Sequence, residues 1–215
     1  MPVESPPVAV SASKQARSPG AQGRSKGEQT RRDILDAAIA RFGRDGYRGT
    51  SVADIARDAG VNGTAAYAYF DNKKALFLAA LDDDAASAIS EGMSIVFDED
   101  AERWREGLLA TLVESVRRHR LAARILANLE PDVTDRVVDL PALAELRKAV
   151  ADRLAVEQFD GKVRSDIDPM VVGSGMVSIL LSLLMTITQL GEHAPLDQAA
   201  DIIAVFRAAL DRLPA

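Results

Sequence analysis

The chain of 215 residues contains 26 Lys and Arg, 32 Asp and Glu, two His and no Cys. Without cysteine it cannot build a disulfide framework, a thiolate metal site or an iron–sulfur cluster, and two histidines leave little for metal or acid–base chemistry. With 47% hydrophobic residues, a chain of this length can bury a substantial core. The composition predicts a soluble globular protein without a metal or cofactor.

The charge is divided unevenly along the chain. Residues 1–77 hold 12 basic and 8 acidic residues, a balance of +4, whereas residues 78–215 hold 14 and 24, a balance of −10. A small basic part joined to a larger acidic body is typical of a DNA-binding head on a body that does not bind DNA, although chance can produce the same division.

The first 29 residues are rich in Pro, Ser, Gly, Ala and basic residues and show no amphipathic period. We therefore expect residues 1–29 to form a disordered basic arm. They do not resemble a signal peptide, because the apolar stretch at residues 8–10 is too short and Glu4 stands where basic residues would be needed. We expect a cytoplasmic protein.

The rest of the chain shows apolar residues at helical spacing and no sustained alternation of the kind found in strands, which predicts an all-α fold. We expect the first helix over residues 30–44. Thr30 can cap its N-terminus, and Gly46 can stop it.

Two short helices should follow. Ser51 can cap a helix over residues 51–59, and Gly60 suits the left-handed residue of a tight turn. Asn62 can cap a third helix over residues 62–70. Two short helices joined by such a turn predict a helix-turn-helix, which makes residues 30–77 a DNA-binding domain.

Longer helices are expected in the remainder, residues 78–215, with breaks at Pro, Gly or polar clusters. Their expected ranges are 73–96, 101–119, 121–129, 140–159, 169–190 and 195–213. The helix over 169–190 carries no charge and is long enough to cross a membrane. Its Gly, Ser and Thr residues and the lack of a flanking basic cluster favour a helix buried in protein, so we expect no membrane partner.

The span from Arg31 to Phe77 resembles the DNA-binding domain of the TetR (tetracycline repressor) family of bacterial transcription regulators. The order and spacing of many residues carry the resemblance. They are Ile34, Ala38, Phe42, Gly46, Tyr47, Thr50, Ser51, Ile55, Ala56, Gly60, Val61, Tyr67, Tyr69, Phe70, Lys73, Leu76 and Phe77.

The resemblance implies that the hydroxyl of Tyr67 and the ammonium of Lys73 contact DNA phosphates, whereas a buried Tyr67 and a solvated Lys73 are the ordinary alternatives. The N-terminus of the second helix offers free N–H groups to a phosphate as well. The candidate DNA-binding residues are Arg32, Thr50, Ser51, Asn62, Gly63, Thr64, Ala65, Tyr67, Tyr69 and Lys73. We expect Phe70 to be core.

Two departures from the family pattern are Ala66, where a large apolar residue is usual, and Ala68, where His, Trp or Tyr is frequent. The third helix therefore has few hydrogen-bonding side chains. We expect base recognition to rely on few direct bonds, on methyl contacts to thymine, on DNA shape, and on arm contacts in the minor groove. The arm residues that can make such contacts are Lys26, Arg31 and Arg32.

Specific binding by a helix-turn-helix usually needs two half-sites roughly 34 Å apart, so we expect a homodimer on a palindromic or near-palindromic operator. The helix over 169–190 has small residues at positions 173, 174, 175, 178 and 182, which suit close approach by another helix. The helix over 195–213 has an apolar stripe. The resemblance implies that both helices pair with their copies, and the alternative is burial of both within one subunit.

The resemblance also implies that a small molecule binds within the C-terminal helices and shifts the helix that begins near Lys73. Met93, Trp104, Met176 and Leu180 are pocket candidates, because flexible Met and a large aromatic residue suit apolar ligands. Each can equally be plain core.

These expectations combine into a homodimeric repressor that a small, largely apolar molecule releases from double-stranded DNA. The alternatives are an effector-independent activator or architectural DNA-binding protein, or an all-α enzyme. The sequence offers no catalytic constellation for an enzyme.

His119 lies among arginines at the end of an expected helix, which predicts a solvated helix end. The acidic runs at residues 82–84 and 98–100 have no neighbouring His in the sequence and no calcium-loop spacing, so we expect no metal site.

Overall fold

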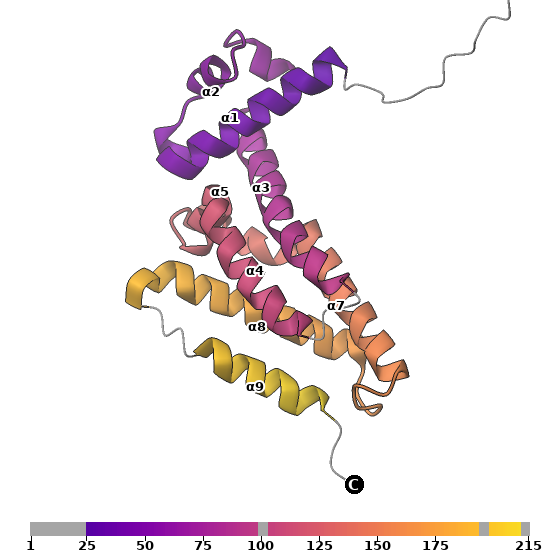
Figure 1. The fold of residues 1–215 in the computed structure, drawn as a ribbon. Helices are drawn as coiled ribbons and strands as arrows, with labels where there is room; N and C mark the ends of the chain where they lie inside the picture. Colours follow the sequence, from indigo (N-terminus) through magenta and orange to yellow (C-terminus); the bar gives the residue numbers. More distant parts are fainter. Residues whose placement is uncertain (1–24, 99–102, 194–197, 212–215) are drawn as a thin grey trace, which may run out of the picture.

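The computed structural model describes residues 25–98, 103–193 and 198–211. Within these ranges the chain is helical and has no strand, as the periodicity predicted. Figure 1 shows a small N-terminal domain on one end of a larger helical body. The expected arm lies, apart from residues 25–29, outside the described residues.

The N-terminal domain contains α1 (Lys26–Gly49), α2 (Val52–Asp58) and the 3-10 turn η1 (Ala65–Ala68). The helix α3 (Lys73–Val96) begins in this domain and continues into the body (Figure 1). The hydrophobic core of the domain is formed by buried side chains from each of these helices and by Phe70. They are Ile34, Leu35, Ala38, Phe42, Val52, Ile55, Ala56, Ala66, Leu76 and Phe77.

The first helix begins four residues earlier than expected. Ser25 and Glu28 form a capping box, in which the Glu28 amide donates to Ser25 Oγ (3.2 Å) and the Ser25 amide donates to Glu28 Oε2 (2.7 Å). The prediction of a Thr30 cap is therefore wrong, and the Thr30 hydroxyl instead donates to the Lys26 carbonyl (2.9 Å). Gly46 does interrupt the helix, with φ 74° and ψ 173°.

The third helix differs most from the expectation. The range 62–70 contains one 3-10 turn, and its α-type hydrogen bond runs from the Phe70 amide to the Ala66 carbonyl (3.0 Å). The Asn62 side chain accepts from the Thr64 amide (3.3 Å), a local bond that competes with helical pairing. Gly60 has φ 68°, which confirms the left-handed turn between the two elements.

The body is built mainly from α3, α4 (Trp104–Arg118), α5 (Arg120–Leu126), α7 (Pro141–Phe159), α8 (Pro169–Leu190) and α9 (Gln198–Leu210). Two short elements that the sequence did not indicate, α6 (Pro131–Thr134) and η2 (Asp135–Asp139), connect α5 to α7, and η3 (Gly191–His193) follows α8. Residues 101, 102 and 195–197 of the expected helices, and residues 212 and 213, lie outside the described residues.

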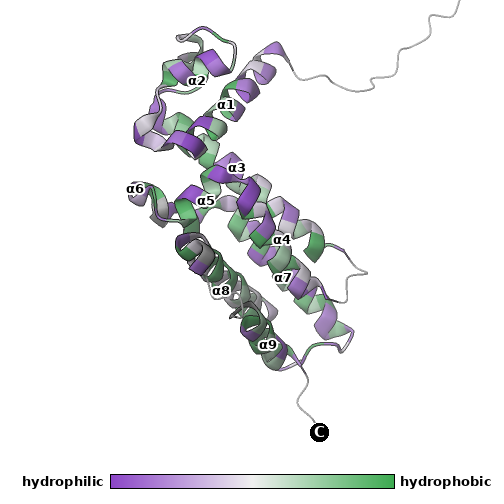
Figure 2. Cartoon of the chain, turned by 60° about the vertical axis from the view of Figure 1, so that its left-hand side comes forward, coloured by the Kyte–Doolittle hydropathy of each residue, from purple (hydrophilic) through white to green (hydrophobic). Residues whose placement is uncertain are grey.

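Helix α5 is shorter than expected because Asn128 adopts a positive φ of 57° just beyond its end. Helices α7 and α8 each begin with a proline, which is tolerated there because the first helical residue needs no amide donor. Helix α8 crosses the body, and α9 turns back beside it on the side away from the N-terminal domain (Figures 1 and 2).

His119 is not a solvated helix end, and this prediction is wrong. Its Nδ1 lies 2.8 Å from Asp84 Oδ1 and its Nε2 lies 3.3 Å from Glu91 Oε1, so the ring joins α3 to the junction of α4 and α5. The other Asp84 oxygen accepts from the Ala122 amide (2.9 Å) at the start of α5. The carboxylates approach the histidine because they lie about two turns apart on one face of α3.

Candidate DNA-binding surface and effector cavity

The N-terminus of α2 is held by local hydrogen bonds. Ser51 is exposed, and its Oγ accepts from the Asp54 amide (3.1 Å), which leaves other amides of the first turn open to an anion. Thr50 is buried and its hydroxyl donates to the Gly46 carbonyl (2.9 Å). This placement does not favour a DNA contact by the Thr50 side chain, whose hydrogen bond closes the end of α1.

Helix α2 is fastened to α1 by a bidentate ion pair. Arg41 donates from Nε to Asp58 Oδ2 (2.5 Å) and from Nη2 to Asp58 Oδ1 (3.0 Å). Hydrogen bonding by Arg41 lowers the pKa of Asp58 below its ordinary value. The pair fixes the angle at which α2 presents the following turn.

The η1 turn has one buried side and one exposed side. Ala66 and Phe70 are buried, as expected for Phe70, and anchor the turn on α1 and α2. Tyr67 is 54% exposed, so its hydroxyl is free to reach a phosphate. Asn62, Thr64 and Ala68 are exposed around it. Ala66 departs from the family pattern at a position where the methyl group is fully enclosed.

The other candidates on this turn are less accessible. Gly63, Ala65 and Tyr69 are partly buried, and Tyr69 also packs against the core. The hydroxyl of Tyr69 lies beside Gly27, 3.8 Å from where a Cβ would stand. Tyr69 therefore contacts the first turn of α1, and a role in reading bases stays a prediction.

Lys73 begins α3 next to this surface. Its Nζ lies 4.4 Å from the ring centroid of Tyr47, a cation–π geometry that keeps the ammonium beside the start of the helix. Asn72 caps the same helix by accepting from the Ala75 amide (2.9 Å). Tyr67, Ser51 and Lys73 thus lie on elements of one small domain, at the end of the molecule away from α9 (Figure 1).

Arg32 is placed differently from the expectation of a DNA-contacting arm. Its guanidinium binds Asp36 (2.7 Å) and Asp83 (2.8 Å), and hydrogen bonds to these carboxylates raise its pKa. Because Arg32 connects α1 to α3, the structure does not favour it as a DNA contact. Arg31 and Lys26 are exposed and stay candidates, although the Arg31 guanidinium lies 5.1 Å from the Phe70 ring centroid.

Comparison with known proteins agrees with this geometry. Residues 34–80 match the family model described as bacterial regulatory proteins, tetR family. The chain is 25% identical over 178 residues to the HTH-type transcriptional repressor AcnR of Corynebacterium diphtheriae, covering 80% of this chain and 88% of the relative. It is 27% identical over 156 residues to the HTH-type transcriptional repressor SCO4008 of Streptomyces coelicolor, covering 73% and 77%.

The fold agrees beyond the matched segment. A TetR-family transcriptional regulator from Pectobacterium atrosepticum superposes with a TM-score of 0.71 at 21% identity, covering 90% of this chain and all of that chain. Residues 34–80 therefore form a helix-turn-helix domain of the TetR type, and the chain as a whole has the fold of the TetR-family regulators that it resembles.

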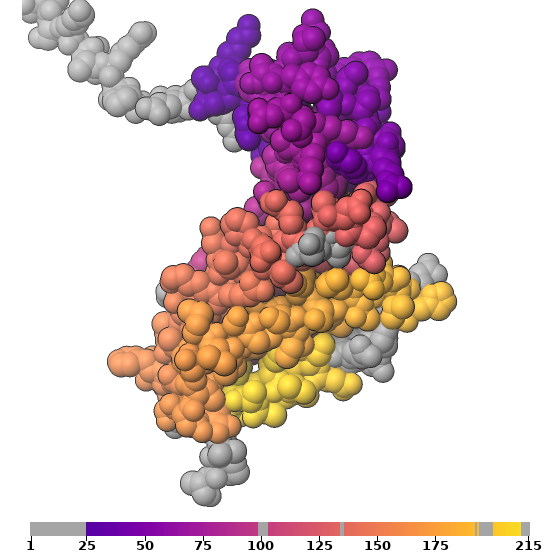
Figure 3. All heavy atoms as spheres, turned by 180° about the vertical axis from the view of Figure 1, so that it is seen from behind, coloured from indigo at the N-terminus to yellow at the C-terminus, as the bar shows by residue number. Residues whose placement is uncertain are grey.

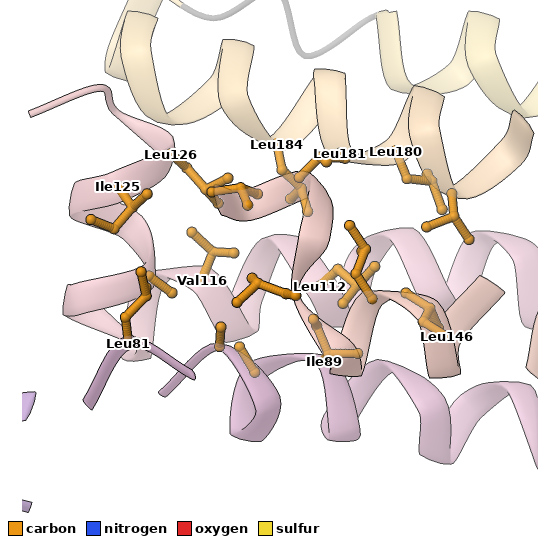
Figure 4. Close-up of a pocket in the computed structure, with 17 residues that line it drawn as sticks. Leu81, Ile89, Leu112, Val116, Ile125, Leu126, Leu146, Leu180, Leu181 and Leu184 are labelled. Carbon is orange, nitrogen blue, oxygen red and sulfur yellow. The ribbon is translucent and has the colours of Figure 1, made fainter. Parts of the chain in front are cut away.

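The body contains an apolar cavity of about 60 Å³. Its lining comes from α3, α4, α5, α7, α8 and the segment before α7, and every lining residue is aliphatic. Figure 4 shows several of these side chains pointing into the space, among them Leu81, Ile89, Leu112 and Leu180. A cavity without polar groups stays dry and accepts apolar ligands.

Of the four pocket candidates, Leu180 lines this cavity and the other three do not. Met93 is partly buried and Met176 is buried, and both pack in the core. The structure does not favour Met93, Trp104 and Met176 as ligand contacts, because flexible and aromatic side chains fill core space as well as they line pockets. The small residues Ala85 and Ala88 on α3 were the missed signal, since they leave room beside a helix.

Trp104 has a structural role. Its indole Nε1 donates to Glu157 Oε1 (2.7 Å), and Glu157 also pairs with Arg105 and Arg153. Both Trp104 and Glu157 are buried, so the network joins the start of α4 to the end of α7. Within the residues that the structure describes, no group of three or more His, Asp or Glu side chains is arranged so that it could hold a metal ion.

By length and composition alone, helix α8 could cross a membrane: its most apolar stretch of 18 residues has a mean hydropathy of 2.1. In the structure, 33% of that stretch is buried. Its small residues divide between two sides. Gly173 faces α7, since a Cβ there would lie 3.0 Å from the Ala151 nitrogen, whereas Gly175 meets open space and Ser178 and Ser182 are exposed. One side of α8 therefore packs against α7, and the other side is exposed within the described part of the chain.

Helix α9 shows the same division. Ile203, Phe206 and Leu210 are buried against the body, and Val205 is 59% exposed. In Figure 3 the atoms of α8 form a band across one face of the body, with α9 below it.

Proposed function

We propose that the protein is a homodimeric repressor that leaves its operator when a small, largely apolar molecule enters the body. The observation that carries this proposal is the course of α3. The helix begins with Lys73 beside the DNA-binding surface, and Leu81, Ala85, Ala88 and Ile89 further along it line the cavity. A ligand in the cavity presses on the helix that carries Lys73.

The coupling free energy between ligand binding and DNA binding need only be modest. A hundredfold change in DNA affinity corresponds to about 2.7 kcal/mol, which a small displacement of packed helices can supply. The Arg32 ion pair to Asp83 on α3 supports transmission, because it ties α1 to the same helix. A shift of α3 therefore carries the reading domain with it.

The uncovered faces of α8 and α9 support a dimer. Val171 is 67% exposed, and Ile179 and Val205 are exposed on the same pair of helices. Covering these apolar side chains with their copies would remove them from water and would present two helix-turn-helix domains to two half-sites. Burial against a second copy also suits a protein that works in the cytoplasm rather than in a membrane.

Two relatives, AcnR and SCO4008, are named transcriptional repressors, which supports repression over activation. The second candidate function is an effector-independent DNA-binding protein. The small volume of the cavity, about 60 Å³, favours it, because a cavity of this size can be a packing imperfection.

Three measurements on the full chain test the proposal. Fluorescence anisotropy should show tighter binding to the DNA upstream of its own gene than to random duplex, with a strong salt dependence. Light scattering after size exclusion should give twice the chain mass. Equal affinity for both duplexes would exclude operator binding, and a monomer at micromolar concentration would exclude the dimer.

A thermal-shift screen of metabolites separates the two candidates. A ligand present at a hundred times its dissociation constant adds about 2.7 kcal/mol to the free energy of unfolding. An effector should raise the melting temperature and lower the DNA affinity. If compounds that stabilise the protein leave DNA binding unchanged, the effector-independent function is the correct one.

A further inference from the structure

We propose that the effector is an amphipathic anion, a carboxylate on an aliphatic tail, whose tail enters the cavity and whose headgroup binds arginines in a neighbouring cleft. The proposal rests on the proposed function for its regulatory consequence. The binding itself can be tested without DNA. The proposal narrows the expected ligand from a generally apolar molecule to one with a charged end and an apolar end.

The cavity limits what can enter it. Its lining is aliphatic throughout, so a buried hydroxyl, amide or charge would find no hydrogen-bond partner there. About 60 Å³ accommodates a short alkyl segment, not a whole amphipathic molecule. Any polar end of a ligand must therefore lie outside the cavity.

A cleft of about 420 Å³ lies next to the cavity, between α1, α4, α5 and the end of α8. Its described lining includes Arg117, Arg120 and Arg124 and no acidic residue. Arg124 is paired, because its Nε donates to Glu130 Oε1 (2.8 Å). Arg120 is exposed and makes no ion pair within the described part of the chain, and Arg117 approaches Glu114 at 3.5 Å. The cleft thus offers positive charge that a carboxylate can use.

The cavity and the cleft share a wall. Val116 of α4 and Leu184 of α8 line both spaces, and Figure 4 shows these side chains beside the cavity. A ligand that spans both spaces must displace these two buried aliphatic side chains, which form the wall between them. Other cleft residues, including Val113, Ala123 and Ile187, continue the apolar surface toward the opening.

The cleft also touches the DNA-binding domain. Gly43 of α1 belongs to its lining, and a Cβ at Gly43 would lie 3.0 Å from Arg120 Cβ and 3.1 Å from the Leu121 nitrogen. The two helices are in close contact at this point. An anion at Arg120 therefore acts on α1, while the tail acts on α3, and both helices belong to the reading domain.

Calorimetry with the full chain, without DNA, tests the headgroup. Decanoate, decanol and decyltrimethylammonium, kept below their micelle concentrations, share one tail and differ in charge. We expect decanoate to bind most tightly, and Arg120→Gln to weaken decanoate about tenfold or more while leaving decanol unchanged. Arg103→Gln removes an exposed arginine at the far end of α4 and should change neither. Equal binding of decanoate and decanol, or insensitivity to Arg120→Gln, would overturn the proposal.

Tail length tests the cavity. Each added methylene contributes about 0.8 kcal/mol when buried, so two carbons should strengthen binding roughly tenfold from butanoate upward until the cavity is full. Leu180→Phe fills the cavity and should abolish the gain with length, with thermal unfolding used to verify the fold. Val116→Phe, in the shared wall, should do the same if Leu180→Phe fails to fold. A tail-length series with no gain in either the wild type or the variants would overturn the cavity assignment.

Decanoyl-coenzyme A distinguishes a free carboxylate from an acyl thioester. Tighter binding of the thioester than of decanoate would overturn the carboxylate headgroup. The ligand proposal and the proposed function can fail independently of each other. If decanoate binds in an Arg120-dependent way but leaves operator affinity unchanged, the site stands and ligand-controlled release is wrong. If decanoate does not bind but another compound releases DNA, the function stands and this ligand class is wrong.

Discussion

The ammonium of Lys73 lies 4.4 Å from the ring centroid of Tyr47, which ties the first residue of α3 to the end of α1. The Tyr47 ring packs against Phe77 (5.1 Å between centroids) and Phe42 (6.2 Å), so it is itself fixed by the core. A lysine side chain is normally free to occupy many rotamers, and this contact restricts them. Lys73 is therefore positioned before DNA binds.

Replacing Lys73 by Ala should weaken binding to all DNA sequences and reduce the slope of log affinity against log salt by about one, because one phosphate is no longer neutralised. Anisotropy titrations at several salt concentrations measure both quantities. Lys148→Ala is the matched control, because it removes the same charge from an exposed position on α7, paired with Asp152. Unchanged affinity and slope for Lys73→Ala would rule out its phosphate contact.

The exposed side of η1 should separate positioning from recognition. Tyr67→Phe removes the hydroxyl of an exposed side chain and should lower affinity on every sequence by about 1 kcal/mol, with preference unchanged. Asn62→Ala or Thr64→Ala should instead change the ranking of operator variants, by about 1–3 kcal/mol at one base pair. Binding to a library of operator variants measures both effects. A change of preference in Tyr67→Phe would reverse these roles.

Gly46→Ala should destabilise the protein by about 1–3 kcal/mol, since φ 74° with ψ 173° is a region that other residues rarely adopt. A Cβ there would also stand 2.7 Å from Glu130 Oε1, whose carboxylate accepts from the Tyr47 amide (3.0 Å). Urea unfolding measures the change. Gly49→Ala is the control, because its Cβ would meet Asp45 Cβ at an ordinary 3.5 Å, and it should be neutral or slightly stabilising. Equal stability of the two variants would contradict the conformational argument.

Glu91 should contribute stability that depends on pH. Burial raises its pKa, but hydrogen bonds with His119, Arg118 and Ser115 outweigh burial, and the pKa is lowered overall. A carboxylate with a lowered pKa in the folded state stabilises the fold above its ordinary pKa of about 4.3 and loses this contribution as the pH falls through the lowered value.

The difference in unfolding free energy between the wild type and Glu91→Gln should therefore be about 0.5–1 kcal/mol at pH 7, as for a partly exposed pair, and should shrink below about pH 4. Urea titrations at a series of pH values measure it. Glu145→Gln on the exposed side of α7 serves as the control and should show no such trend. A difference that grows toward acid pH would show that the folded-state pKa is raised instead.

Much of the helical plan could be predicted because it depends on local properties. Apolar spacing located α3, α7 and α8 to within a residue of their ends, and Gly46 and Gly60 marked backbone positions that need a positive φ. The resemblance located the helix-turn-helix segment for the same reason, since its residues lie within one continuous stretch of the chain. An α-helix was wrongly predicted where η1 lies. The Asn62 side chain accepts a hydrogen bond from the Thr64 amide, which competes with helical pairing, and apolar periodicity gives no information about such a local bond.

By itself, the sequence determined the class of fold and the helix-turn-helix segment, because both follow from residue spacing along neighbouring turns. Only the tertiary structure decided which side chains meet across the chain. It paired Arg32 with Asp83, enclosed His119 between Asp84 and Glu91, and placed Leu180, but not Met93, Trp104 or Met176, beside the cavity. The ion pairs and hydrogen bonds join residues tens of positions apart, which local spacing cannot predict. The cavity could not be predicted because aliphatic side chains that fill a core and those that line a cavity have the same helical spacing.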